Sequence, residues 1–95
     1  MIVLKYELQV GRQRVMLPIK RKILSAQIQR EALCLWVVVD NRSKLEDVVI
    51  YVVGTGQSLD PFDFPDIDHL PEYIATAQGD GAYVWHVFVE PQGGV

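Results

Sequence analysis

The sequence predicts an all-β domain, a small antiparallel β-sandwich or partly open barrel of about seven strands. Apolar and polar residues alternate over several short segments, which is the period of a half-buried strand. Turn residues separate these segments at short intervals, and no segment shows a helical period with caps. The 95 residues suffice for one core, so we expect a single domain over residues 1–90. Residues 91–95 are expected to form a flexible tail.

The first two expected strands occupy residues 2–10 and 14–19. One face of the first consists of Leu4, Tyr6, Leu8 and Val10. The inward face of the second consists of Val15, Leu17 and Ile19. A turn at 11–13 predicts that the two strands form a hairpin. Pro18 places the second strand at a sheet edge or a bulge, because proline cannot donate a ladder hydrogen bond.

The next two strands are expected over residues 22–30 and 33–40. Alternation in the first places Leu24, Ala26 and Ile28 on one face, opposite Ser25, Gln27 and Gln29. The segment LCLWVVVD at 33–40 is apolar on both faces, which is typical of a central strand.

The C-terminal half predicts three more strands and one long loop. Residues 48–53 are apolar on both faces and end at Gly54-Thr55-Gly56. Three prolines and four aspartates exclude a regular strand from residues 57–71. Residues 72–78 and 83–90 form a final hairpin, in which His86 lies on the face opposite Trp85. His86 therefore faces solvent or a partner, unless both faces of that strand are buried.

Charge is distributed unevenly along the chain. Residues 1–44 carry all nine basic and three acidic residues, whereas residues 45–95 carry nine acidic ones. The two halves either mix their charges on one surface or attract each other across a subunit interface. The single cysteine, Cys34, has no disulfide partner in the chain and is expected to be buried. No apolar run is long enough for a membrane span, and no leader precedes the first strand, so we expect a cytoplasmic protein.

The residues give little support to catalysis, and we expect no enzyme. Only His69 and His86 are available as histidine ligands, so no metal or cofactor is expected. A nucleophilic pair of Cys34 with His86 is conceivable across strands, but the apolar run around Cys34 argues against a reactive thiol. The turn Gly54-Thr55-Gly56 resembles an anion-binding nest, although it lacks the lysine of a nucleotide P-loop. Its alternative role is to let the strand turn sharply into the loop.

Two sets of residues are candidates for binding. A small polar or nucleotide-like ligand requires aromatic faces for stacking and polar groups for hydrogen bonds. The sequence offers for this purpose Gln27, Trp36, Tyr51, Thr55, Gln78, Trp85 and His86. A protein partner would contact the acidic loop through Asp60, Phe62, Asp63, Phe64, Asp66 and Asp68. The alternatives are a solvated polar face for the first set and, for the second, a loop folded onto the core with its aromatic rings inward.

Five segments, taken in order, resemble a known family. They are KILSAQIQ at 22–29, CLWVVVD at 34–40, GTG at 54–56, YIATAQ at 73–78 and VWHVFVE at 84–90. Together they resemble small bacteriophage and prophage proteins that form a family of unknown function. The likeness covers residues 6–90, but the acidic, proline-rich insert after GTG is longer here. The resemblance implies a phage origin and action in the cytoplasm of a bacterial host, with no known activity or catalytic residues.

These observations lead to three hypotheses of function. The first is a non-enzymatic, homo-oligomeric counter-defence protein that sequesters a nucleotide-like host signal. The second is a protein-contact inhibitor that binds a host defence protein through its acidic loop. The third is a structural virion component. The expected partners are further copies of the chain and a host small molecule or protein; no membrane or nucleic acid is expected.

Overall fold

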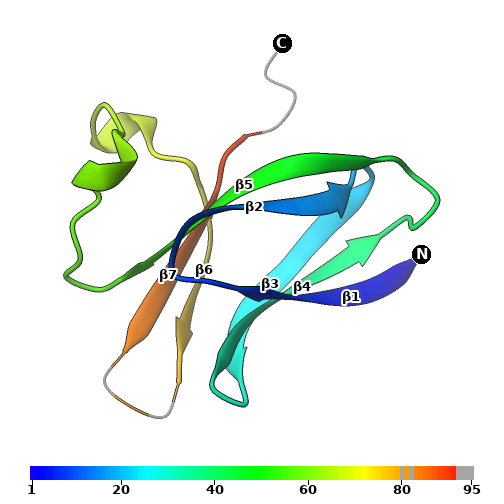
Figure 1. The fold of residues 1–95 in the computed structure, drawn as a ribbon, viewed down its shortest axis with the longest axis horizontal. Coiled ribbons are helices and arrows are strands. Elements are labelled where there is room, and N and C mark those ends of the chain that lie inside the picture. The colour runs from blue at the N-terminus through cyan, green and yellow to red at the C-terminus, as the bar shows by residue number, and fades with distance from the viewer. Residues whose placement is uncertain (80, 82, 92–95) are drawn as a thin grey trace.

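The computed structural model describes residues 1–79, 81 and 83–91, and these form seven strands in two antiparallel sheets (Figure 1). The strands are β1 (Ile2–Leu8), β2 (Gly11–Pro18), β3 (Arg21–Gln29), β4 (Ala32–Val39), β5 (Leu45–Gly54), β6 (Glu72–Gln78) and β7 (Val84–Val89). The three-stranded sheet has the order β1-β4-β3, and the four-stranded sheet has the order β2-β5-β7-β6. The predicted sandwich of about seven strands is confirmed, and the sheets do not close into a barrel. The expected tail falls largely outside the described residues, at 92–95.

The core lies between the two sheets, and alternation along the strands supplies it. The largest fully buried side chains come from β2, β4, β5 and β7: Leu17, Leu35, Val37, Val39, Val48, Ile50, Val52 and Val87. Strand β4 lies between β1 and β3, as its two-sided apolar sequence predicted. Strand β5 is buried on both faces from Val48 to Gly54, which also agrees with the sequence pattern.

The predicted hairpin of the first two strands is wrong. β1 pairs with β4, and β2 pairs with β5 in the other sheet, so the chain crosses between sheets at residues 9–10. Alternation identifies the buried face of a strand but does not indicate which strand it pairs with. A short connection can join two strands of one hairpin or two strands of different sheets. Pro18 does lie at an edge of its sheet, because β2 is the outermost strand.

Three residues expected on inward faces are exposed. Val10 and Ile19 lie just beyond the ends of β1 and β2, where the chain leaves the sheet, and are 59% and 53% exposed. Leu24 is 50% exposed because the register of β3 against β4 shifts between Ile23 and Ser25. Ile23 takes the inward position and packs against the core, while Ala26 and Ile28 keep the predicted side. A bulge therefore reverses the faces of β3 at one point, which a strict period of two does not anticipate.

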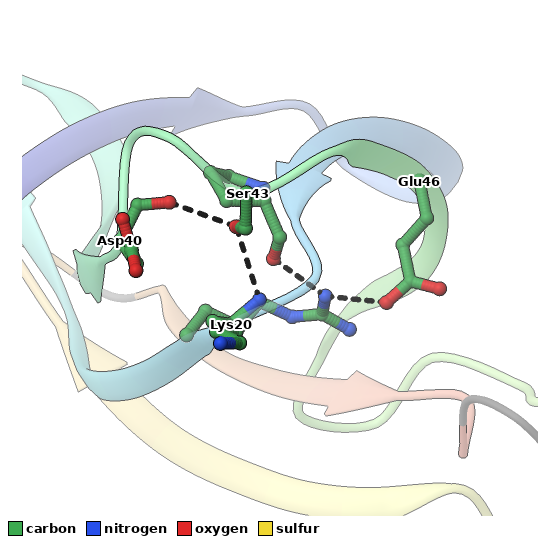
Figure 2. A network of polar contacts seen from close by, with 6 residues as sticks. Lys20, Asp40, Ser43 and Glu46 are labelled. Carbon is green, nitrogen blue, oxygen red and sulfur yellow. Dashed lines mark hydrogen bonds and ion pairs between the residues drawn. The ribbon is translucent and has the colours of Figure 1, made fainter.

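One end of the sandwich is held together by polar contacts between the two connections that cross the sheets there (Figure 2). The Arg21 guanidinium donates to the Pro18 carbonyl at 2.8 Å and to the Glu46 carboxylate at 2.7 Å. The Ser43 hydroxyl donates to the Asp40 carbonyl and accepts from the Lys20 amide. The β2–β3 connection is thereby joined to the β4–β5 connection.

The edge strands β3 and β6 lie side by side, with Cα atoms within 8 Å of each other. Gly79, directly after β6, packs so closely on Ile28 that an added Cβ would lie 3.3 Å from that side chain. A larger residue would push the two sheets apart at this point. The β3–β4 and β6–β7 hairpins consequently end near each other, at the bottom of the view in Figure 1.

Candidate functional site

A concave surface lies at the end of the sandwich where these two hairpins turn. It is an open groove of about 530 Å³. Its lining comes from the end of β3, the end of β6 and the start of β7: Ile28, Arg30, Glu31, Gln78, Gly79, Gly81, Tyr83 and Trp85. The groove thus collects two predicted ligand residues, Gln78 and Trp85, from the two strands of one hairpin.

Two aromatic rings lie along the groove. Tyr83 and Trp85 stack with centroids 5.7 Å apart and an angle of 12° between their planes. Trp85 is partly buried and packs against the core, whereas the Tyr83 side chain is 71% exposed. The core thereby anchors one ring of the pair, and the other extends the aromatic surface into solvent. Flat aromatic rings at an open site are suited to stacking against a planar ligand.

The opposite wall is a strained turn. Gln29 pairs with Ala32, so Arg30 and Glu31 form a two-residue hairpin loop, and both have positive φ values, 50° and 69°. Asparagine and glycine are the usual residues in such a turn, since a Cβ atom makes this backbone conformation unfavourable by about 1–2 kcal/mol per residue. Here both positions carry long charged side chains, and both line the groove. Backbone strain of this kind gathers at functional sites.

A second pocket, of about 230 Å³, continues the groove toward the end of β1. It shares Ile28, Glu31 and Trp85 with the first. It adds residues from β1, from the crossing at 9–10, from β4 and from β5: Glu7, Leu8, Gln9, Val10, Ala32, Leu33 and Val52. The combined surface therefore runs from the β6–β7 turn to the point where the chain crosses between sheets. Trp85 lies where the two pockets meet.

The lining of the groove carries charged and polar groups that are able to contact a ligand. The Arg30 guanidinium can hold a phosphate or carboxylate, the Gln78 amide both donates and accepts, and the Glu31 carboxylate accepts. Among the described residues, no group of three or more histidine, cysteine or acidic side chains is arranged to hold a metal ion. The lining residues offer aromatic stacking and hydrogen bonding.

The other predicted ligand residues lie elsewhere. Gln27 and Trp36 occupy the outer face of the three-stranded sheet, because their strand neighbours Ala26, Leu35 and Val37 point into the core. Tyr51, Thr55 and His86 belong to the outer face of the four-stranded sheet. The seven residues are therefore divided among three surfaces, and only Gln78 and Trp85 meet in the groove.

His86 belongs to a chain of hydrogen bonds across the outer face of β7. Its Nε2 lies 2.6 Å from the Thr55 hydroxyl, and its Nδ1 lies 3.1 Å from the Thr76 hydroxyl. The Thr76 hydroxyl in turn lies 2.8 Å from that of Tyr73. Val87 and Val89 are buried on the inner face, so His86 faces outward and is not a core residue. Both ring nitrogens have partners within the domain, so the position of the ring is set by this chain.

The acidic loop is folded onto the four-stranded sheet. Phe62 and Phe64 each contact Tyr51 edge to face, with centroids 5.1 and 4.9 Å apart. They cover the outer face of β5, where Tyr51 is only 5% exposed. The two short 3₁₀ turns η1 (Asp60–Phe62) and η2 (Ile67–His69) carry the chain across that face. Of the two alternatives for this loop, the one with inward aromatic rings is therefore observed.

The aspartates of the loop remain exposed, with one of them organising η2. Asp60, Asp63, Asp66 and Asp68 all face solvent. The Asp66 carboxylate accepts a hydrogen bond from the Asp68 amide and lies 2.6 Å from Nδ1 of His69. Ile67, between these residues, is 83% exposed. The surface that the loop offers a partner is thus acidic, with Ile67 and Leu70 as its exposed large apolar side chains, while the predicted phenylalanines pack on Tyr51.

Cys34 is buried, as its apolar surroundings predicted, and is 3% exposed. Its thiol contacts the Ala32 carbonyl at 3.7 Å. Cys34 points to the outer side of the three-stranded sheet, since Leu33 and Leu35 on either side of it belong to the core. His86 lies on the outer side of the other sheet, so the two residues do not form a nucleophilic pair.

The groove also contains residues that sequence reasoning did not select. Arg30 and Glu31 were expected only as the end of a strand and a tight connection, and Tyr83 as one more strand aromatic. The signal in the sequence was the two-residue spacing between two strong strand patterns, with charged residues in place of glycine or asparagine. Residues that disfavour a positive φ at such a turn indicate that the pairing of the flanking strands, and not the turn sequence, imposes the backbone conformation.

Fold and site together define a β-sandwich domain with an aromatic and charged groove at one end. The chain belongs to the DUF7352 family, a domain of unknown function, whose model matches residues 1–94. No curated protein and no solved structure matches it. In the described part of the chain, no helix has the length and apolar character that crossing a bilayer requires.

Proposed function

We propose that the domain is a non-enzymatic binding protein whose groove holds a nucleotide-like molecule. The observation that carries the proposal is the stacked pair Tyr83 and Trp85 facing the Arg30–Glu31 turn. A nucleotide has a planar base and an anionic phosphate, and the groove offers an aromatic face and a guanidinium within one concave surface. Gln78 adds an amide that can hydrogen-bond the edge of a base.

The strained turn supports the same proposal. Arg30 and Glu31 project from a two-residue loop whose backbone is fixed by the pairing of Gln29 with Ala32, so both charged side chains start from defined positions beside the groove. The resemblance to phage proteins leads us to propose further that the ligand is a host signalling nucleotide, and that the protein sequesters it in the bacterial cytoplasm as a counter-defence factor.

The test uses the fluorescence of Trp85. In a Trp36→Phe variant Trp85 is the remaining tryptophan, because the chain has two. ATP, cyclic AMP and a panel of cyclic dinucleotides are titrated into this variant. At least one is expected to quench Trp85, since stacking brings a base against the indole. Mass spectrometry of protein purified from host cells provides an independent check for a retained nucleotide.

Variants locate the binding site. Arg30→Ala should weaken binding by about tenfold or more, because it removes a charge-assisted contact to phosphate. Gln27→Ala, on the outer face of the three-stranded sheet and outside the lining of the groove, is the matched control and should bind as the parent does. Absence of quenching up to millimolar concentrations, together with absence of a retained ligand, would reject the proposal.

A second function, contact with a host protein, draws support from the acidic loop. Ile67 projects from the loop among exposed aspartates, an arrangement suited to a basic protein surface with a small apolar pocket. The variant Ile67→Asp leaves Phe62 and Phe64 on Tyr51 and should abolish capture of any specific host protein. Capture that persists in this variant, and that does not weaken with salt, would exclude the loop as the contact.

A further inference from the structure

The four edge strands of the two sheets differ in how they are protected from pairing with other chains. An exposed edge offers unpaired backbone groups to a further strand. β2 carries Pro18 at its end, and β3 and β6 lie beside each other. β1 is the outer strand of the three-stranded sheet, and its far side faces no other strand of the described chain. Among the described strands, the outer edges of β1 and β2 both lack a neighbouring strand, and the edge of β1 is the one that no proline interrupts.

The sequence of β1 is self-complementary in the antiparallel sense. Its central residues are Leu4-Lys5-Tyr6-Glu7-Leu8. When two copies run antiparallel with Tyr6 opposite Tyr6, Leu4 lies opposite Leu8, and Lys5 lies opposite Glu7. Apolar residues then meet apolar ones, and each lysine meets a glutamate. Opposite charges directly across two antiparallel strands are favourable, whereas like charges are unfavourable.

The burial of these residues fits the same arrangement. Leu4 and Tyr6 face the core but are only partly buried, because β1 borders the open side of its sheet. Lys5 and Glu7 are exposed on the outer face. A second strand along β1 would cover the partly exposed apolar side chains and leave the charged ones paired at the surface.

We propose that β1 is a homodimerisation edge, at which two copies pair their β1 strands antiparallel about a two-fold axis at Tyr6. The two three-stranded sheets become one continuous six-stranded sheet. Such a contact is isologous and closed. It therefore gives a dimer and does not extend into a larger assembly. It lies on the β1 edge and does not rest on the proposed ligand of the groove.

Charge reversal tests both the edge and its register. In the dimer, Lys5→Glu makes both facing pairs glutamate against glutamate, and Glu7→Lys makes both of them lysine against lysine. Each single variant should weaken the dimer by about tenfold or more. An equimolar mixture of the two should form a heterodimer, because both of its facing pairs then join a glutamate of one chain to a lysine of the other. The double variant K5E/E7K should regain the homodimer, because every facing pair is then again of opposite charge.

The measurement is molar mass by light scattering after gel filtration, with dissociation constants from analytical ultracentrifugation. The wild-type chain should have twice its 10.8 kDa mass. Lys5 also donates to Gln29 at 2.8 Å, so Gln29→Ala is the matched control that removes this bond without changing charge, and it should remain dimeric. Circular dichroism confirms that each variant is folded.

A wild-type chain that is monomeric at the highest concentration reached would overturn the proposal. The β1 edge would then be open for pairing with an extended segment of another protein. A dimer that neither reversal weakens would also overturn it, because its interface would then lie elsewhere. Failure of the double variant to regain the dimer would contradict the register centred on Tyr6.

Discussion

The two ends of the sandwich are built on different principles. At the end containing Arg21 and Glu46, two connections between the sheets are joined by hydrogen bonds and an ion pair at 2.7 Å. At the other end, the Arg30–Glu31 turn has an unfavourable backbone and borders an open groove. Polar side chains at the first end form hydrogen bonds within the domain, while those of Arg30 and Glu31 at the second end face solvent. Polar contacts between connections are concentrated at the Arg21 end, and exposed charged and aromatic side chains gather at the end where the β3–β4 and β6–β7 hairpins turn.

The largest expected effect is at the joined end. Arg21→Ala should lower the free energy of unfolding by about 1–3 kcal/mol, because it leaves the Glu46 carboxylate and the Pro18 carbonyl without their donor. For a domain of this size, that corresponds to a fall in melting temperature of about 4–8 °C per kcal/mol. Urea denaturation followed by circular dichroism measures the change.

Two controls accompany this variant. Arg14 lies 3.8 Å from Asp47, with both side chains more than half exposed, so Arg14→Ala should change stability by about 0–1 kcal/mol. Arg30→Ala, at the groove, should stay within about 0.5 kcal/mol of the wild type. If all three variants lost the same stability, the proposed difference between the ends would be wrong.

A smaller change of opposite sign is expected in the strained turn. Glu31→Gly should raise the free energy of unfolding by up to about 1 kcal/mol, since glycine adopts a positive φ without steric cost. The matched control is Gln27→Gly, within β3, which should lower stability by about 0.5–1 kcal/mol. Differential scanning calorimetry distinguishes the two. A destabilised Glu31→Gly variant would show that the Glu31 side chain makes a stabilising contact that outweighs the strain.

The smallest effect concerns pH at the joined end. The backbone amide of Arg42 donates to the Asp40 carboxylate and lowers the pKa of Asp40 below its usual 3.8; the Arg42 guanidinium and the charge of Lys20 act in the same direction. A carboxyl with a lowered folded-state pKa contributes stability above its unfolded pKa and loses it as pH falls through the folded value. Acidification from about pH 6 to about pH 3 should therefore destabilise the wild type slightly more than Asp40→Asn. Equal losses in urea titrations at the two pH values would contradict this.

The sequence predicted the positions of the strands more successfully than it predicted which strands pair with each other. The two-sided apolar patterns of residues 33–40 and 48–53 correctly indicated buried strands, since burial is a property of each strand alone. The partners of β1 and β2 were predicted wrongly, because pairing depends on which sheet each strand joins. Leu24 was placed on the wrong face because the bulge at Ile23 inserts a residue, and no glycine marks it.

The candidate site was predicted only in part, and for a related reason. Trp85 and Gln78 were selected for their chemistry, and the groove does contain them. Gln27 and Trp36 have equally suitable chemistry but lie on another surface, as composition does not show which strands share a face. Arg30 and Glu31 were missed. Their place in the groove depends on a turn with two positive φ angles, and charged residues do not indicate such a turn in the sequence.

The crossing of the chain between sheets at residues 9–10 bears on how the domain folds. β1 can pair only once β4 is present, because Leu8 pairs with Leu33 and Ile2 with Val39. β2 likewise requires β5. Within the described chain, only the β3–β4 and β6–β7 hairpins unite strands adjacent in sequence. During synthesis, the first two strands therefore emerge from the ribosome well before their partners. Closure of these long loops costs entropy before pairing compensates for it, so we expect folding in milliseconds to seconds, with the hairpins forming before β1 and β2 are added.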